Sequence, residues 1–287
     1  MKKIVASVLA IAMAAIVLVG CGGGASTTTE TKSTTEDTST GKIAAYTEED
    51  LGKDFVFKHG FDQEFPPYAY RNDNGETGGF DVELAQAVCD YYGWKYEPVP
   101  FNWDAKDMEL NAGSCDCIWS GFTINGREDN YLWSMPYSDN EQMIMVKKNS
   151  DIKKLDDLAG KNVGVQTDTS AYTMLTEGEQ KELASKFGNL QVFPDYTTAF
   201  TELKAGSIDA IAIDITTGDH LIKDDKDYGY LEEKLGNEQY GIGFRKGDDV
   251  LCKKVNEALD ALVADGTFAK LGEKYPEIQP YLSLGKK

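Results

Sequence analysis

The chain of 287 residues contains only two histidines, His59 and His220, and neither lies close to a pair of cysteines in the sequence. Zinc sites are commonly built from cysteine and histidine ligands, so we expect no metal site. Nothing in the sequence requires a cofactor either. No histidine is paired with a candidate nucleophile, which argues against an enzyme.

Positive charge is also scarce. Lysine and arginine number 29 against 48 aspartates and glutamates, and the formal net charge is −19. Proteins that bind nucleic acid present basic surfaces to the phosphates, so the composition gives no support to a nucleic-acid-binding function. The acidic balance favours solubility and indicates nothing more specific.

Long apolar runs are missing except at the start, where Ile4–Val19 follows Lys2 and Lys3. This run is shorter than the roughly 20 residues of a membrane-spanning helix, and we predict that residues 1–20 form a signal peptide. The small residues before Cys21 resemble the lipobox of bacterial lipoproteins. That resemblance implies cleavage before Cys21, fatty acyl chains such as palmitate on it, and anchoring to the outer face of the cell membrane or in the periplasm. An ordinary secretory signal is the alternative.

Residues 21–46 are rich in threonine, serine, glycine and acidic residues and poor in apolar ones. Such a segment buries too little apolar surface to offset the entropy of ordering it. We therefore predict a flexible tether between the lipid anchor and a folded body. The rest of the chain, about 240 residues, is long enough for one large or two modest domains.

Helical and strand patterns alternate along the body. Apolar positions recur with helical spacing in three segments, and glycines follow them as stop signals. Strands separated by helices favour an α/β fold. The predicted elements are helices at 80–92, 198–205 and 250–263, a helix that begins near Thr169 and Ser170, and strands at 162–166 and 208–213.

Four further cysteines lie in the body. Cys115 and Cys117 alternate in a predicted strand, so they point to opposite faces and should not bond to each other. Cys89 and Cys252 occupy apolar positions of predicted helices. Two disulfides are possible, and four buried free thiols are the simpler interpretation.

Three groups of short segments form an ordered pattern. They are FDQEFPPYAY at 61–70 with GGFDVELA at 78–85, the stretch from Trp103 to Arg127 with WSMPY at 133–137, and LAGKNVGVQ at 158–166 with LKAGSIDA at 203–210 and YGIGF at 240–244. Over residues 47–284 this order and spacing resemble the bacterial extracellular solute-binding proteins of family 3. These are amino-acid-binding proteins of ATP-driven importers with the type II periplasmic-binding fold.

The resemblance implies a fold of two α/β lobes joined by two hinge strands. The chain would pass between the lobes twice, and the ligand would bind in the cleft between them, as is common at domain interfaces. The implied limits are lobe 1 at 47–138 and 241–284, lobe 2 at 142–236, and hinges at 139–141 and 237–240.

The resemblance also assigns the two charges that would hold a free amino acid. Arg127 matches the arginine that binds the ligand carboxylate in a bidentate pair, and Asp214 matches the acid that pairs with the ammonium. Asp209 is interpreted as structural. Between Thr123 and Arg127 the chain is one residue shorter than the usual family pattern, and Gly126 could absorb the tighter turn.

The other implied ligand-binding positions surround these charges. Phe65 and Trp103 would sandwich the ligand's side chain, and Asp62 and Gln166 would meet its polar end. The remaining matches are Gly121 and Thr123, which would offer a backbone carbonyl and a hydroxyl or amide, and Thr169 and Ser170 at a helix start, where free N–H groups favour an anion. No acid is expected in the cleft beyond those assigned to recognition.

The function implied is capture of a free amino acid by hinge closure and delivery to the permease of an ABC importer. A buried Asp62 would repel an acidic side chain, so glutamine or another polar amino acid is expected, with a basic one next. We expect a monomer that binds no nucleic acid. The alternatives are a dehydratase that uses the same cleft, an amino-acid sensor that acts through a partner, and an adhesin on the same scaffold.

Overall fold

The structure is a computed structural model that describes residues 43–72 and 74–286, which belong to one compact unit. The predicted signal peptide, Cys21 and most of the predicted tether lie outside the described residues. Within the described part of the chain, no helix combines the length and the apolar character needed to cross a membrane.

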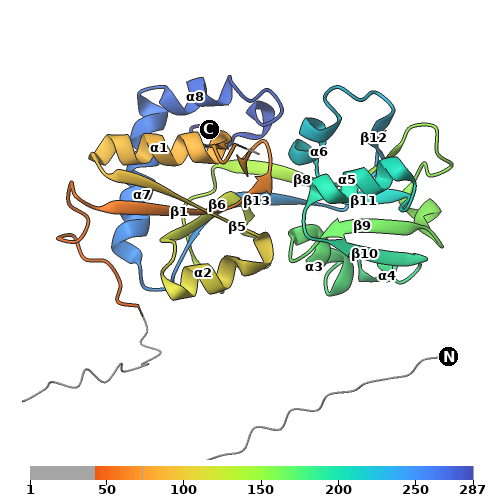
Figure 1. Ribbon diagram of the computed structural model, residues 1–287, viewed down its shortest axis with the longest axis horizontal. Helices are drawn as coiled ribbons and strands as arrows, with labels where there is room; N and C mark the ends of the chain where they lie inside the picture. Colours follow the sequence, from red (N-terminus) through yellow and green to blue (C-terminus); the bar gives the residue numbers. More distant parts are fainter. Residues whose placement is uncertain (1–42, 73, 287) are drawn as a thin grey trace, which may run out of the picture. The chain divides into compact units, whose positions relative to one another are not determined.

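A mixed sheet forms the centre of the unit. In the described residues its strand order is β10-β9-β11-β8-β13-β6-β1-β5, with β12 paired to β8 and β7 paired to β13 (Figure 1). The strands are β1 (Val56–Asp62), β5 (Lys95–Phe101), β6 (Cys117–Thr123), β7 (Leu132–Trp133), β8 (Ser138–Lys147), β9 (Asn162–Gln166), β10 (Asn189–Phe193), β11 (Ala210–Asp214), β12 (Tyr228–Tyr230) and β13 (Gly236–Phe244). A small second sheet contains β2 (Glu64–Phe65), β3 (Ala69–Arg71) and β4 (Thr77–Gly78).

Helices flank both ends of the large sheet (Figure 1). They are α1 (Phe80–Tyr92), α2 (Lys106–Ala112), α3 (Ser170–Thr176), α4 (Lys181–Ala184), α5 (Tyr196–Ala205), α6 (Ile215–Ile222), α7 (Asp249–Ala264) and α8 (Thr267–Gly272), with short 3₁₀ turns at Trp103–Ala105, Leu155–Leu158 and Gln279–Tyr281. We call β1, β5 and β6 with α1, α2, α7 and α8 the first lobe, and β9 to β12 with α3 to α6 the second lobe.

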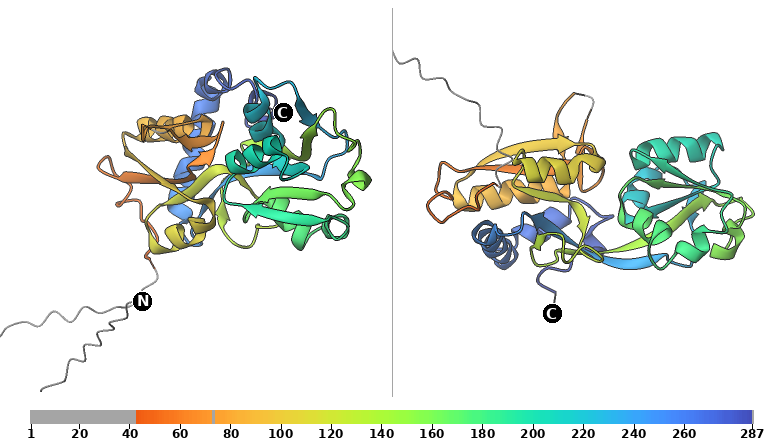
Figure 2. Two further views of the ribbon diagram at one scale, coloured as in Figure 1. Left: turned by 45° about the vertical axis from the view of Figure 1, so that its right-hand side comes forward. Right: turned by 90° about the horizontal axis from the view of Figure 1, so that it is seen from below.

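Two long strands connect the lobes (Figure 2). β8 and β13 pair antiparallel from Ser138 opposite Tyr240 to Gln142 opposite Gly236. β8 then continues beside β11, and β13 continues beside β6. This arrangement confirms the predicted fold of two α/β lobes joined by two hinge strands. The predicted hinge residues lie inside the paired segments, and the lobe limits given above remain predictions.

Several elements agree with the sequence patterns, and two begin elsewhere. α1 ends at Gly93, which has φ 71°, in the left-handed region that glycine adopts without a Cβ clash. α5 begins two residues before the predicted Thr198, because the Asp195 side chain accepts a hydrogen bond from the Thr198 backbone N–H and caps the helix. β11 covers 210–214 rather than 208–213.

The four cysteines of the body are buried and free, which confirms the interpretation without disulfides. β6 begins at Cys117, so Cys115 precedes the strand rather than belonging to it. Burial raises the pKa of Cys115 to about 12 and that of Cys252 to about 11. Thiols in such surroundings stay protonated and unreactive near neutral pH.

Candidate functional site

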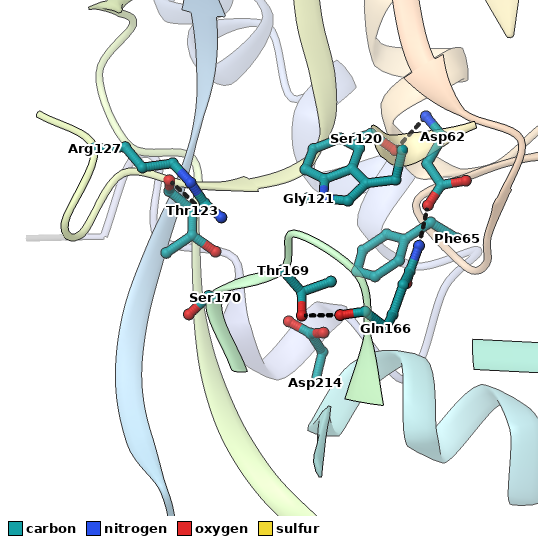
Figure 3. Close-up of a pocket in the computed structure, with 11 residues that line it drawn as sticks. Asp62, Phe65, Ser120, Gly121, Thr123, Arg127, Gln166, Thr169, Ser170 and Asp214 are labelled. Atoms are coloured by element: carbon teal, nitrogen blue, oxygen red, sulfur yellow. Dashed lines mark hydrogen bonds between the residues drawn. The ribbon is translucent and has the colours of Figure 1, made fainter. Parts of the chain in front are cut away.

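A pocket between the lobes is lined by residues from distant parts of the chain (Figure 3). All ten positions singled out in the sequence contribute to it, and Ser120 is an eleventh. The lining residues are Asp62, Phe65, Trp103, Ser120, Gly121, Thr123, Arg127, Gln166, Thr169, Ser170 and Asp214.

The pocket lies where parallel strands end. Asp62 is the last residue of β1, Gln166 the last of β9 and Asp214 the last of β11. β1 is parallel to β6, and β9 is parallel to β11. In open α/β sheets, ligands bind in the crevice beyond the carboxyl ends of the strands, and here each lobe supplies one such edge.

Gly121 shapes the first-lobe wall of the pocket. Its φ is 55°, and a Cβ at this position would lie 2.7 Å from Cε1 of Phe65. The position therefore requires glycine both for its backbone angle and for the place of the aromatic ring. Its N–H donates to the carboxylate of buried Asp81 at 2.7 Å, and the Tyr137 hydroxyl donates to the same oxygen. Burial raises the pKa of Asp81 to about 7, against the lowering effect of these hydrogen bonds.

Arg127 reaches the pocket despite the shortened segment before it. Gly126 has φ 78° and takes the tight turn in the left-handed region. The guanidinium lies 5.3 Å from the centre of the Phe122 ring, a cation–π contact. Nη1 donates to the Thr123 carbonyl at 3.3 Å, and Nη2 donates to the Asp168 carbonyl at 3.1 Å. The first of these contacts is local, and the second crosses to the other lobe.

Asp168 receives two more donors from the first lobe. The Trp103 indole N–H donates to its carbonyl at 3.0 Å, and the ammonium of Lys106 forms an ion pair with its carboxylate. Lys106 is only 1% exposed, and Asp168, at φ 54°, is the one non-glycine residue with positive φ in the described part of the chain. We call these contacts, together with the one from Arg127, the Asp168 contacts. Neither Asp168 nor Lys106 was singled out in the sequence.

One end of the pocket is rich in hydrogen-bond acceptors. Gln166 Nε2 donates to Asp62 Oδ2 at 2.8 Å, and the Glu64 N–H donates to Asp62 Oδ1 at 3.0 Å. Burial raises the pKa of Asp62 to about 7, against those two hydrogen bonds, which lower it. Gln166 Oε1 is buried, and no donor reaches it within the described residues. This end of the pocket can accept hydrogen bonds or, when Asp62 is ionised, a positive charge.

The other end of the pocket holds Asp214 in a set of hydrogen bonds. Asn140 Nδ2 donates to its Oδ1 at 2.9 Å, Gln142 Nε2 donates at 2.6 Å, and the Tyr240 hydroxyl also donates to this oxygen. Burial raises the pKa of Asp214, and the charge of neighbouring Glu238 raises it further.

Glu238 is a further buried acid beside the pocket, although it is not one of the residues that line it. Its side chain is buried, accepts from Asn140 at 2.7 Å and from Gln142 at 2.9 Å, and also accepts from the Ser170 hydroxyl. The sequence did contain a signal for it. Glu238, Tyr240 and Ile242 share one face of β13 by the two-residue period of a strand, and all three are buried.

Thr169 caps α3 as the sequence predicted. Its hydroxyl accepts from the Tyr172 N–H at 3.2 Å and donates to the Gln166 carbonyl at 2.9 Å (Figure 3). The pocket enclosed by these side chains has a volume of about 20 Å³, which is room for one or two water molecules. A larger molecule can enter only if the walls part.

The profile of bacterial extracellular solute-binding proteins, family 3, matches residues 57–277. The L-cystine-binding protein TcyJ of Escherichia coli strain K12 is 31% identical over 220 residues, covering 75% of this chain and 80% of TcyJ.

Two solved structures of binding proteins are also similar. A substrate-binding protein of an ABC uptake transporter from Streptococcus pneumoniae, with bound histidine, superimposes with a TM-score of 0.73 at 31% identity, covering 77% of this chain and 92% of that one. An ancestral arginine-binding protein bound to glutamine has a TM-score of 0.70 at 34% identity, covering 77% and 97%. An ancestral arginine-binding protein bound to arginine has a TM-score of 0.70 at 33% identity.

Proposed function

Because the chain belongs to the bacterial extracellular solute-binding proteins of family 3, we propose that it captures a polar free amino acid between its lobes and delivers it to an ABC importer. Proteins of this family bind amino acids for ABC transport, and the relatives named above are binding proteins rather than enzymes. The observation that carries the proposal is that Arg127 on the first lobe and Asp214 on the second line one pocket.

The two charges suit the two ends of a zwitterion. The Arg127 guanidinium would bind the carboxylate in a bidentate pair, and Asp214 would take the ammonium. Burying either ligand charge without a partner would cost several kcal/mol. Charge-assisted hydrogen bonds contribute about 1.5–3 kcal/mol each, so a few of them reach the −8 kcal/mol or so of a micromolar dissociation constant.

Capture would proceed by hinge closure. The walls must part to admit an amino acid, and the Asp168 contacts join the lobes directly across the pocket. Opening would break these contacts, and closing over a ligand would restore them or replace the one from Arg127. The paired segments of β8 and β13 are the only strands that pass between the lobes in the described residues, so the bending would occur there.

The side chain of the ligand would be one that donates hydrogen bonds. Asp62 and the free Gln166 Oε1 offer acceptors, and the rings of Phe65 and Trp103 line the space beside them. An amide or a basic group fits that chemistry, and a carboxylate does not. We place glutamine first and a basic amino acid next, in keeping with the ancestral arginine-binding proteins solved with glutamine and with arginine.

The first residues of the sequence support a proposal about where the protein acts. We propose that residues 1–20 are a signal peptide and that Cys21, outside the described residues, carries a lipid anchor on the extracytoplasmic side of the membrane. The body would act as a monomer on a flexible tether and dock with the permease subunits of the importer.

Calorimetric titration with L-glutamine and L-arginine at several pH values tests the ligand assignment. We expect both to bind, and the affinity for L-arginine to rise relative to L-glutamine as pH rises through about 7. The reason is that the Asp62 carboxyl, whose pKa burial raises to about 7, is neutral below this pH and attracts a guanidinium above it. The change below pH 7 would approach tenfold per unit, or about 1.4 kcal/mol.

The variant Asp62→Asn provides the control, because its amide does not titrate and the ratio of the two affinities should then be independent of pH. A ratio that stays constant in the unmodified protein would contradict the role of Asp62. Absence of binding for all twenty amino acids and for cystine, in calorimetry and in thermal shift, would overturn the proposed function itself.

A further inference from the structure

The buried carboxyl groups of Asp214 and Glu238 share the same hydrogen-bond donors at the end of the pocket that holds Asp214. Asn140 Nδ2 and Gln142 Nε2 each lie within 3.0 Å of both Asp214 Oδ1 and Glu238 Oε1. Both acids are 3% exposed. The two carboxyl groups are therefore held side by side, away from water, by neutral amides.

Among the described residues, no cation balances this pair. In the part of the chain that the structure describes, no lysine, arginine or histidine forms an ion pair with either acid. The titratable groups that face the pair are the hydroxyls of Tyr68, Tyr196 and Tyr240, all buried. Arg127 is the cation of the same pocket, and its contacts are with carbonyl groups.

Two adjacent carboxylates in such surroundings cannot both stay ionised without compensation. Their mutual repulsion and the loss of hydration together favour holding one proton between them. Gln142 Oε1 is also buried, and no donor reaches it within the described residues. A group with several N–H donors and a positive charge would balance the two carboxylates and also donate to Gln142 Oε1. The ammonium of an amino acid is such a group.

We propose that Glu238 and Asp214 form a carboxyl pair that holds one proton in the unliganded protein and exchanges it for the ammonium of the ligand. This inference rests on the proposed function, in which Asp214 receives the ammonium. The exchange keeps the charge of the site constant, because one proton leaves as one ammonium enters. Glu238 is then a positioning residue, which sets the negative charge available to the ammonium through Asp214.

Glu238 also offers a route by which the proton can leave the carboxyl pair. Besides its contact with Ser170 at the pocket, it lines a separate open groove together with Asn140 and with the acidic residues Asp139 and Glu141. The carboxyl pair thus lies between the ligand pocket and this groove. A proton can leave through the groove while the ligand occupies the pocket.

The number of protons released on binding tests the proposal. Calorimetry with L-glutamine and L-arginine, in buffers that differ in ionisation enthalpy, measures it directly. We expect release of about one proton per bound amino acid near neutral pH, and an affinity that rises by up to about tenfold per pH unit while the pair titrates. In Glu238→Gln the release should fall below about half of that value, and the pH dependence should flatten.

Glu141→Gln is the matched control. Glu141 is an acid of the adjacent strand β8, and it forms an ion pair with Lys234 on the surface. The proton release of this variant should equal that of the unmodified protein. Equal release by Glu238→Gln and the unmodified protein, or binding without release, would overturn the proposal while leaving amino-acid capture intact. If neither amino acid nor any other of the twenty binds, the proposed function fails first.

A measurement without ligand checks the same pair. The carboxyl pair would keep its proton in the folded protein up to a higher pH than the same carboxyl groups do in the unfolded chain. The stability that the bound proton contributes is therefore lost as pH rises through the titration of the pair in the folded state. The melting temperature of the unmodified protein should therefore fall relative to Glu238→Gln between about pH 4 and about pH 8. If the melting temperatures of the two proteins changed by the same amount over that pH range, the shared proton would be contradicted.

Discussion

Replacing Arg127 with alanine should weaken binding of L-glutamine or L-arginine by about 30-fold to about 5,000-fold, because truncating one partner of a buried charge pair costs about 2–5 kcal/mol. The ligand carboxylate would enter the closed pocket without a guanidinium, and the lining offers no second lysine or arginine to replace it. Isothermal calorimetry measures the loss.

The fold should survive this substitution. Among the described residues Arg127 donates to two backbone carbonyls and lies against the Phe122 ring, so the melting temperature should change little. Arg71→Ala is the matched control, since Arg71 is an exposed arginine of the same lobe whose side chain contacts the Gly75 carbonyl, and it should bind like the unmodified protein. If Arg127→Ala bound the amino acid with the same affinity as the unmodified protein, Arg127 would not be a ligand-binding residue.

Replacing Asp214 with asparagine should reduce affinity by a comparable factor and should not reduce stability. The asparagine carbonyl can still accept from Asn140 and Gln142, but the amide carries no charge for the ammonium. Burial and Glu238 raise the pKa of Asp214, so its ionised form is a cost to the folded state that grows as pH rises. At pH 8 or so the variant should melt at the same temperature as the unmodified protein or higher.

Asp209→Asn is the control for this experiment. Asp209 lies just before the same strand, and its carboxylate accepts from the Asn162 N–H at 2.8 Å on the surface, in line with the structural role predicted for it. This variant should keep its affinity. If Asp214→Asn kept full affinity and Asp209→Asn lost it, Asp209 would be the acid that binds the ammonium and Asp214 would be structural.

Local motifs carry the predicted residues whose place on the pocket wall follows from the sequence. Asp62 and Phe65 stand in one segment, and Gly121, Thr123 and Arg127 in another. Each segment folds as a strand end with its loop, so order along the chain is enough to place its residues on the pocket wall. The shortened turn before Arg127 was also anticipated, because glycine is the residue that adopts positive φ.

The residues that the sequence did not predict depend on contacts between distant segments. Lys106 reads as an ordinary polar position of a short helix, and only the approach of Asp168, 62 residues away, makes it a buried ion pair. Nothing in the sequence marks Asp168 as a residue with positive φ. Glu238 is the instructive case, since the strand period places it inward beside Tyr240 only once the bounds of β13 are known.

A crystal structure of the protein with bound L-glutamine, or with L-arginine if that binds more tightly, tests the central claim most directly. The account predicts one amino acid in the pocket between the lobes, with its carboxylate on the Arg127 guanidinium and its ammonium within hydrogen-bonding distance of Asp214. An amino acid bound outside this pocket, or bound inside it with its ammonium away from Asp214 and its carboxylate away from Arg127, would contradict the account.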